Sequence, residues 1–118
     1  MARFHLSGPA QADLQNILAL SVERHGVEGR RRYAALVAAA LRGVAANPEG
    51  PATRDRGDVF TGIRSFHIRH ARGDVPGEKV TRPVHIIYYR AAQPGVIEII
   101  RVLHERMEPA LHIGDDKS

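Results

Sequence analysis

The sequence predicts a two-layer α+β domain of element order βααβββ, in which a helical hairpin packs on an antiparallel β-sheet. Two stretches with helical periodicity come first and are separated by Gly26. Three stretches with strand character follow between residues 62 and 103, with turn-forming residues between them. The hairpin must bury an apolar stripe and the strands must bury one face, so packing the two layers together satisfies both.

The first strand and the first helix are predicted within residues 2–25. Residues 2–6 alternate loosely between apolar and polar, and Gly8-Pro9 marks a helix start with Ser7 or Gly8 as the N-cap. We expect Gly26 to end this helix in a left-handed cap. The residues that recur every three or four positions on its buried stripe are Leu14, Ile17, Leu18, Ser21 and Val22.

A second helix is predicted from about Val27 to Asn47, where Asn47-Pro48 stops it. Charged side chains such as Arg30 and Arg42 lie on its outer face. Two helices joined by one glycine indicate an antiparallel hairpin. The stripe of the second helix consists of Tyr33, Leu36, Val37, Ala40, Leu41 and Val44.

The rest of the chain alternates between loops and strands. Its predicted order is loop 48–61, strand 62–69, loop 70–82, strand 83–90, turn 91–95, central strand 96–103 and a short mixed segment 104–112 with Pro109. We expect one core between the layers, which the strands fill with Phe66, Tyr88, Ile99 and Leu103. The helices fill it with Leu14, Ile17, Leu18, Tyr33, Leu36, Val37 and Leu41.

Length and composition restrict the class of protein. A chain of 118 residues and 13.0 kDa has room for one domain, which we expect to span residues 1–113, with residues 114–118 as a frayed tail. The absence of Cys excludes a disulfide scaffold, a thiol nucleophile and thiolate metal sites. No apolar run reaches the roughly 18 residues of a membrane span, and the N-terminus lacks a signal-peptide core. We therefore expect a cytoplasmic protein with no membrane partner.

The charge pattern is basic, and familiar catalytic motifs are missing. The net charge is +4, and the 17 basic residues are 15 Arg and 2 Lys. Arg suits bidentate recognition of phosphate or carboxylate, but no run of five basic residues occurs, and ordinary solvated charge is the simpler interpretation. The sequence has no phosphate loop, GxGxxG, GxSxG or HExxH motif. We expect no cofactor and no metal site.

Four residues on or beside the strands are candidates for chemistry. Arg101 is predicted to share a strand face with Ile97, Ile99 and Leu103, so it needs either a cleft or a partner such as Glu98 or a helix carboxylate. A meander that gathered its basic groups on one surface would clamp an RNA phosphate, with His104 as acid or base. That group consists of Arg64, Arg90, Arg101 and His104. Scattered solvated charge is the alternative.

Several segments resemble the RelE/ParE superfamily of type II toxin–antitoxin toxins. The C-terminal stretch IEIIRVLHERMEPALH is similar to the run "I-E-I-x-R-V-L-H-x-R-M-D" that commonly closes the ParE branch, with Glu108 where Asp is usual. LSGPAQADL near the start resembles the family's "L-S-P-A-A-x-x-D-L", with Gly8 extra. The pieces ANP, GIRSF and IIYYR recur in the same order, so the resemblance spans about residues 3–112. Residues 68–83 depart from it by a longer loop.

This resemblance implies a fold and two possible targets. The family fold is a helical hairpin over an antiparallel sheet. ParE-like toxins poison DNA gyrase, whereas RelE-like toxins cleave mRNA on the ribosome. In both branches an antitoxin wraps the toxin with its C-terminal segment, and the complex represses its own operon, so operator DNA is contacted only through the antitoxin.

The ParE-like interpretation is a gyrase-inhibiting binding protein with no catalytic residue, neutralised by a ParD-like antitoxin. The alternative is a ribosome-dependent endoribonuclease that uses the four candidate residues above. The chain has only two lysines, in a predicted loop and tail, and it ends in GDDKS without the terminal Tyr or His of many such nucleases. A third hypothesis is a member that only co-represses with its antitoxin. The candidate partner-binding residues are Arg64, Arg69, Arg90, Arg101, His104 and Arg106.

Overall fold

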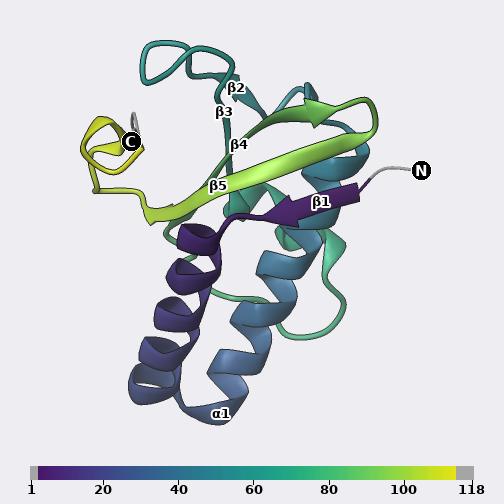
Figure 1. The fold of residues 1–118 in the computed structure, drawn as a ribbon. Coiled ribbons are helices and arrows are strands. Elements are labelled where there is room, and N and C mark those ends of the chain that lie inside the picture. The colour runs from purple at the N-terminus through teal and green to yellow at the C-terminus, as the bar shows by residue number, and fades with distance from the viewer. Residues whose placement is uncertain (1–2, 114–118) are drawn as a thin grey trace.

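The computed structural model describes residues 3–113 and confirms the predicted two-layer α+β fold. A helical hairpin lies against one face of a five-stranded sheet of order β1-β5-β4-β3-β2 (Figure 1). The expected frayed tail, residues 114–118, lies outside the described residues. No helix among residues 3–113 is long and apolar enough to span a membrane. The elements are β1 (Arg3–Leu6), α1 (Gly8–Ala46), β2 (Arg54–Asp55), β3 (Arg64–His67), η1 (Ile68–Asp74), β4 (His85–Gln93), β5 (Val96–His104) and η2 (Pro109–Leu111).

The label α1 covers both arms of the hairpin, which a kink at Gly26 separates. Gly26 has φ +76° and ψ −177°, so its φ is positive as predicted but its ψ is extended rather than that of a left-handed helical cap. The N-cap is Ser7, whose side chain accepts a hydrogen bond from the Ala10 N–H. The second arm ends at Ala46, with Asn47 as the C-cap before Pro48.

The sheet is mixed, because β1 joins it in a different direction from the other strands. β1 pairs parallel to β5, from Arg3 opposite Val96 to Leu6 opposite Ile99. The pairs β5–β4, β4–β3 and β3–β2 are antiparallel, as expected for a meander. The strand predicted as central, β5, therefore lies between two neighbours, and the N-terminal strand forms an edge of the sheet (Figure 1).

Several boundaries differ from the prediction, including the starts of β3 at Arg64 and of β4 at His85. The loop 48–61 contains the short strand β2, which pairs with β3. The strand predicted over 62–69 ends at His67, because the chain turns into η1 at Ile68. The turn predicted over 91–95 is shorter, because β4 continues to Gln93 by pairing with β5. In each case a partner strand or a local turn overrides weak intrinsic propensity.

A bulge in β5 reverses the faces of the strand. Tyr89 lies opposite Ile99 and Tyr88 opposite Arg101, so Ile100 is an extra residue without a partner on β4. Beyond this bulge, Val102 packs in the same cluster as Ile99, whereas Leu103 packs in a different one. Arg101 therefore lies on the face away from the hairpin, and its predicted placement with Ile97 and Ile99 is wrong.

The sheet consequently carries a core on each face. The core beneath the hairpin contains Ile97, Ile99 and Val102 of the sheet, and Leu36, Val37 and Leu41 of α1, with Leu14, Ile17, Tyr33 and Phe66 packed against it. The second core lies on the other face and consists of Ile63, Tyr88, Leu103 and Ile113, with Val59, Ile86 and Ile100 against it.

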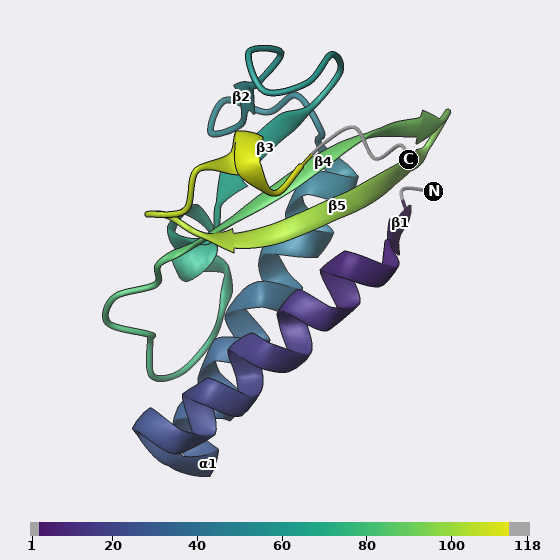
Figure 2. The same ribbon diagram turned by 60° about the vertical axis from the view of Figure 1, so that its left-hand side comes forward.

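Two predicted members of the first core, Tyr88 and Leu103, thus belong to the second, and Leu18 is only half-buried. The segment that follows β5 folds back on the side away from the hairpin (Figure 2). It brings Ile113 onto that face of the sheet.

We expect Leu36→Ala to lower the free energy of unfolding by about 2–5 kcal/mol, because truncation leaves a cavity in the first core. Leu36 is 2% exposed, whereas Leu111 is 79% exposed and provides the matched control. Urea unfolding monitored by circular dichroism measures both variants. Equal effects of Leu36→Ala and Leu111→Ala would show that the hairpin stripe is not buried against the sheet.

Candidate functional site

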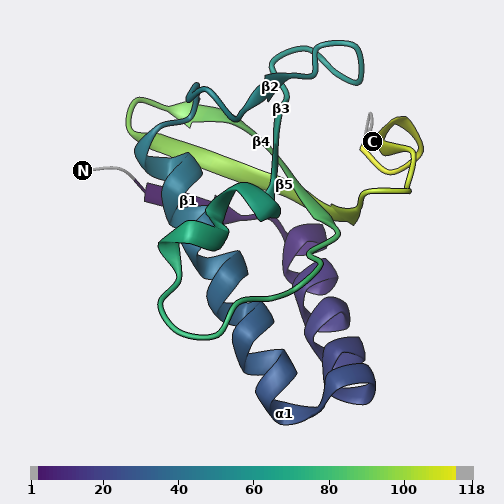
Figure 3. The ribbon, with the colours of Figure 1, turned by 180° about the vertical axis from the view of Figure 1, so that it is seen from behind.

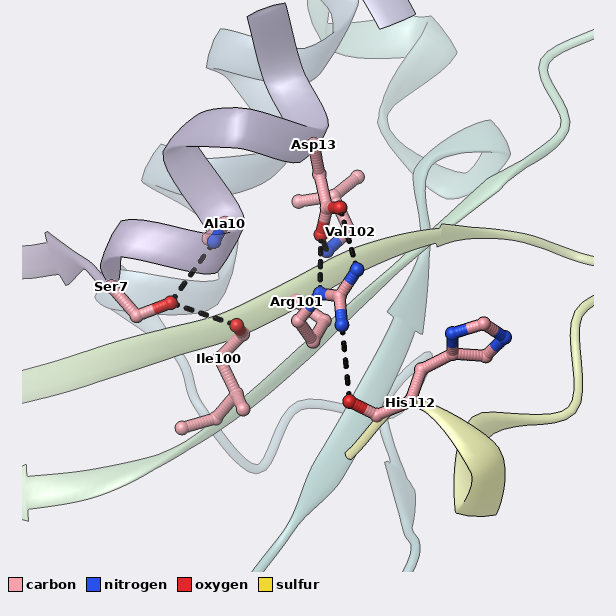
Figure 4. Close-up of polar contacts among 7 residues, drawn as sticks. All are labelled: Ser7, Ala10, Asp13, Ile100, Arg101, Val102 and His112. Atoms are coloured by element: carbon pink, nitrogen blue, oxygen red, sulfur yellow. Dashed lines mark hydrogen bonds and ion pairs between the residues drawn. The ribbon is translucent and has the colours of Figure 1, made fainter. Parts of the chain in front are cut away.

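An ion pair between Arg101 of β5 and Asp13 of the first helical arm joins the two layers (Figure 4). Arg101 Nε donates to Asp13 Oδ2 and Arg101 Nη2 donates to Asp13 Oδ1, each at 2.8 Å. This is the bidentate geometry that a guanidinium and a carboxylate favour. The two side chains are only 22% and 13% exposed, so solvent screens the pair weakly.

The Asp13 carboxylate also hydrogen-bonds to the backbone of β5 beyond the point where β1 ends. Asp13 Oδ2 also accepts the Val102 N–H, at 2.9 Å. Six residues earlier, the Ser7 hydroxyl accepts from Ala10 N and donates to the Ile100 carbonyl at 2.8 Å (Figure 4). Side chains at the start of α1 therefore take over the hydrogen bonds that a longer β1 would make, which leaves these backbone groups of β5 satisfied.

Arg101 holds a third segment as well. Its Nη1 donates to the carbonyl of His112 at 3.0 Å, and so ties the C-terminal segment to the sheet (Figure 4). The hydrogen bonds from Arg101 to Asp13 raise the pKa of the guanidinium above its ordinary value. The expected helix-carboxylate partner for Arg101 is confirmed, and its side chain is occupied by structural contacts.

The four residues of the phosphate-clamp hypothesis do not gather on one surface. Arg64 lies opposite Tyr89 and donates to Thr53 Oγ1 at 2.8 Å. Arg90 lies on the other face, and its Nη2 is 3.0 Å from Glu98 Oε1. His104 lies opposite His85. Cross-strand neighbours share a face, so both histidines lie on the face of the sheet that the hairpin covers. The structure therefore separates Arg64 and His104 from Arg90 and Arg101.

The two remaining candidates, Arg69 and Arg106, are exposed beside a second polar cluster. His67 Nδ1 accepts from the Arg69 backbone N–H at 3.1 Å, so its Nε2 carries the proton and donates to Glu105 Oε1 at 2.7 Å. That hydrogen bond lowers the pKa of Glu105. Arg106 follows Glu105 directly, so both arginines flank the contact that joins the end of β3 to the residue after β5.

A third polar cluster contains Tyr33, which the sequence analysis placed only in the core, and His85, which it did not select. Val84 N–H donates to the Tyr33 hydroxyl at 3.1 Å, and Tyr33 Oη lies 2.6 Å from His85 Nδ1. The rings of His85 and His104 meet edge to face, with centroids 5.7 Å apart. Burial, reinforced by the nearby His104, lowers the pKa of His85 to about 4. Tyr33 fits a helix stripe and His85 fits a strand, so local pattern contained no signal of their contact.

Nothing in the described chain, residues 3–113, gathers three or more His, Asp or Glu side chains in a way that would hold a metal ion.

Comparisons with known proteins agree on one family. The sequence profile described as "ParE toxin of type II toxin-antitoxin system, parDE" matches residues 4–109. A protein named Toxin ParE1 from Caulobacter vibrioides is 33% identical over 115 residues, which cover 97% of this chain and 100% of that protein. Toxin ParE1 of Mycobacterium tuberculosis is 30% identical over 107 residues, covering 91% of this chain and 93% of that one.

A solved structure, "Chromosomal ParDE TA system from P. aeruginosa", superimposes with a TM-score of 0.64. It covers 88% of this chain and 95% of its own, at 17% identity. At that level of identity the likeness shows a shared fold alone.

We expect Asp13→Ala to lower the free energy of unfolding by about 2–3 kcal/mol, because it leaves a largely buried guanidinium and the Val102 N–H without their acceptor. Glu28→Ala is the control, since Glu28 pairs with Arg31 through side chains that are 65% and 72% exposed, and removing such a pair changes stability little. Chemical denaturation of both variants tests this. Matching midpoints for the two variants would argue against a structural role for the Asp13–Arg101 pair.

We expect stability to fall as the pH drops from about 6.5 to about 4, because His85 is protonated more readily in the unfolded chain than in the folded one. Above pH 6.5, His85 is neutral in both the folded and the unfolded chain, so it does not reduce the free energy of unfolding. Between pH 6.5 and pH 4, the free energy of unfolding falls by up to about 1.4 kcal/mol per pH unit because of this residue. His85→Asn, whose Oδ1 still accepts from Tyr33, should flatten the pH dependence, whereas the exposed His112→Asn should not. Unfolding midpoints measured across the window compare the two, and identical slopes in the wild type and His85→Asn would contradict the assignment.

Proposed function

We propose that this chain, which belongs to the ParE toxin family of type II toxin–antitoxin systems, inhibits DNA gyrase in the cytoplasm and is neutralised by a ParD-like antitoxin. The family match over residues 4–109 is the observation that carries this proposal. The antitoxin holds the toxin in a complex, and operator DNA is contacted through the antitoxin rather than through this chain.

Exposed arginines at one end of the sheet are the proposed partner contacts. Arg69 and Arg106 flank the hydrogen bond between His67 and Glu105, and both are exposed. Charges of this kind accelerate association with an acidic partner, and their effect weakens as salt rises. We do not assign this role to Arg101, because its guanidinium already donates to Asp13 and to the His112 carbonyl. Arg90 is paired with Glu98, and Arg64 with Thr53.

The separation of the four nuclease candidates supports binding over bond cleavage. An endoribonuclease needs its acid, base and phosphate-binding groups around one scissile bond. Arg90 and Arg101 lie on the face of the sheet opposite to His104. Each of these arginines is engaged with a carboxylate of this chain.

The decisive experiment compares two activities of the purified toxin. We expect the wild type to inhibit supercoiling by purified gyrase, the antitoxin to reverse the inhibition, and ribosome-bound mRNA to stay intact. A folded His104→Gln variant should inhibit like the wild type, because glutamine keeps the bulk of the ring but cannot transfer a proton near neutral pH. The double variant Arg69→Gln/Arg106→Gln should inhibit less, with Arg42→Gln as the exposed-arginine control.

Cleavage of mRNA by the wild type, abolished in His104→Gln, would favour the endoribonuclease. No effect on either gyrase or mRNA would favour a member that only co-represses with its antitoxin. Unchanged inhibition by the double variant would leave gyrase as the target but would refute the assigned surface.

A further inference from the structure

A cavity of about 580 Å³ lies between the helical hairpin and the chain that leads into β4. The segment from Glu78 to His85 forms one wall and crosses the hairpin as Figure 3 shows. Ile17 and Leu20 of the first arm and Tyr33 of the second form the opposite wall. The volume is in the range that accommodates a small organic molecule. Part of this wall belongs to the loop in which the chain departs from the family pattern.

Two imidazoles line this cavity with their Nε2–H groups unused. The Tyr33 hydroxyl accepts from Val84 N–H and therefore donates its own proton to His85 Nδ1. His104 Nδ1 accepts from the Arg106 backbone N–H. Each neutral ring consequently carries its proton on Nε2, and neither Nε2 has a hydrogen-bond partner among residues 3–113.

These Nε2 atoms remain accessible. Within residues 3–113, Arg64 Nε is the one fully buried side-chain nitrogen or oxygen without a partner. The unpartnered nitrogens of His85 and His104 are therefore not fully buried, and both residues line the cavity. Neighbouring N–H donors without acceptors are groups to which an oxyanion can bind.

The surrounding charges favour an anion as well. The charged side chains that line the cavity are Arg24, Arg32, Lys79, Arg82 and Glu78. Arg32 lies 3.6 Å from Glu78, which is the single acid among them. Arg24, Lys79 and Arg82 form no ion pair within the described residues, although Arg82 is near enough to Glu105, which does not line the cavity, to lower the pKa of that carboxyl. The cavity lining therefore carries an excess of positive charge. Ile17, Leu20, Val80 and Val84 supply its apolar surface.

We propose that this cavity binds a small organic anion. Its apolar body lies against Ile17, Leu20 and Val84, and its phosphate or carboxylate group accepts hydrogen bonds from His85, His104 and Arg82. This ligand is distinct from the protein partners proposed above, and its binding is tested without gyrase or antitoxin.

Phenyl phosphate is a suitable probe, because it combines an apolar ring with an acid group. Titration by calorimetry, with the imidazole Nε2 signals followed by NMR, should show tighter binding of phenyl phosphate than of inorganic phosphate or of phenol, with shifts at His85 and His104. A parallel titration with benzoate distinguishes a site for phosphates from one for carboxylates. Binding of phenol as tight as that of phenyl phosphate, or no binding of either acid at millimolar concentration, would overturn the proposal.

Two variants distinguish binding in the cavity from general electrostatic attraction of phenyl phosphate to a basic protein. Arg82→Gln changes an exposed residue and should weaken phenyl phosphate binding about tenfold, as expected for the loss of one charge-assisted hydrogen bond. Arg42→Gln removes an exposed arginine that does not line the cavity and should leave the affinity unchanged. Equal weakening by Arg82→Gln and Arg42→Gln would overturn the proposal.

Discussion

The contact between Asp13 and Arg101 determines how the two layers of the molecule are joined. One carboxylate accepts two hydrogen bonds from the guanidinium and a third from the Val102 backbone. The guanidinium in turn holds the His112 carbonyl of the C-terminal segment. A single partly buried pair therefore connects the first helical arm, the interior strand and the segment that covers the outer face of the sheet. Such a pair fixes the relative positions of the segments that it joins. Breaking it leaves several hydrogen-bonding groups without partners at once.

The bulge at Ile100 makes that contact possible. Without the extra residue, Arg101 would share the face of Ile99 and would have to lie in the apolar core beneath the hairpin. The reversal of faces instead places Val102 in that core and Arg101 at the margin, where it reaches Asp13. It also creates the second core, because Leu103 joins Tyr88 on the outer face. An insertion of one residue thus decides which side chains of β5 lie in the core beneath the hairpin and which lie on the outer face.

This arrangement changes how the basic surface is interpreted. Arg101 lies within the longest run that resembles the family, and it acts here as a structural group. Among the candidate partner-binding residues, the exposed Arg69 and Arg106 beside the His67–Glu105 contact form no ion pair within residues 3–113, and they are the ones proposed to meet a partner. On the hairpin side, burial and the nearby His104 lower the pKa of His85, so this ring is neutral near pH 7 and acts in the cavity as a hydrogen-bond donor rather than as a cation. The exposed surface with Arg69 and Arg106 and the cavity lined by His85 and His104 therefore lie at the same end of the sheet, and they differ in their donor groups.

The sequence by itself determined the helical hairpin, its start at Ser7 or Gly8, its end at Asn47-Pro48, and the chain order of the four longer strands. These features depend on local periodicity and on residues adjacent in the chain, so a single sequence contains their signals. It also indicated that Arg101 needs a partner, since a charge in an apolar strand is costly alone.

Only the tertiary structure decided the parallel pairing of β1 with β5, the bulge, the choice of Asp13 and the meeting of Tyr33 with His85. Asp13 and Arg101 are 88 residues apart, and Tyr33 and His85 are 52 apart. A bulge changes the face of every later residue in its strand, and it arises from the pairing of two strands rather than from the propensities of either. The sequence therefore could not show which of its basic residues make structural contacts and which are exposed. The family resemblance was visible without the tertiary structure, because it depends on residues that are adjacent in the chain.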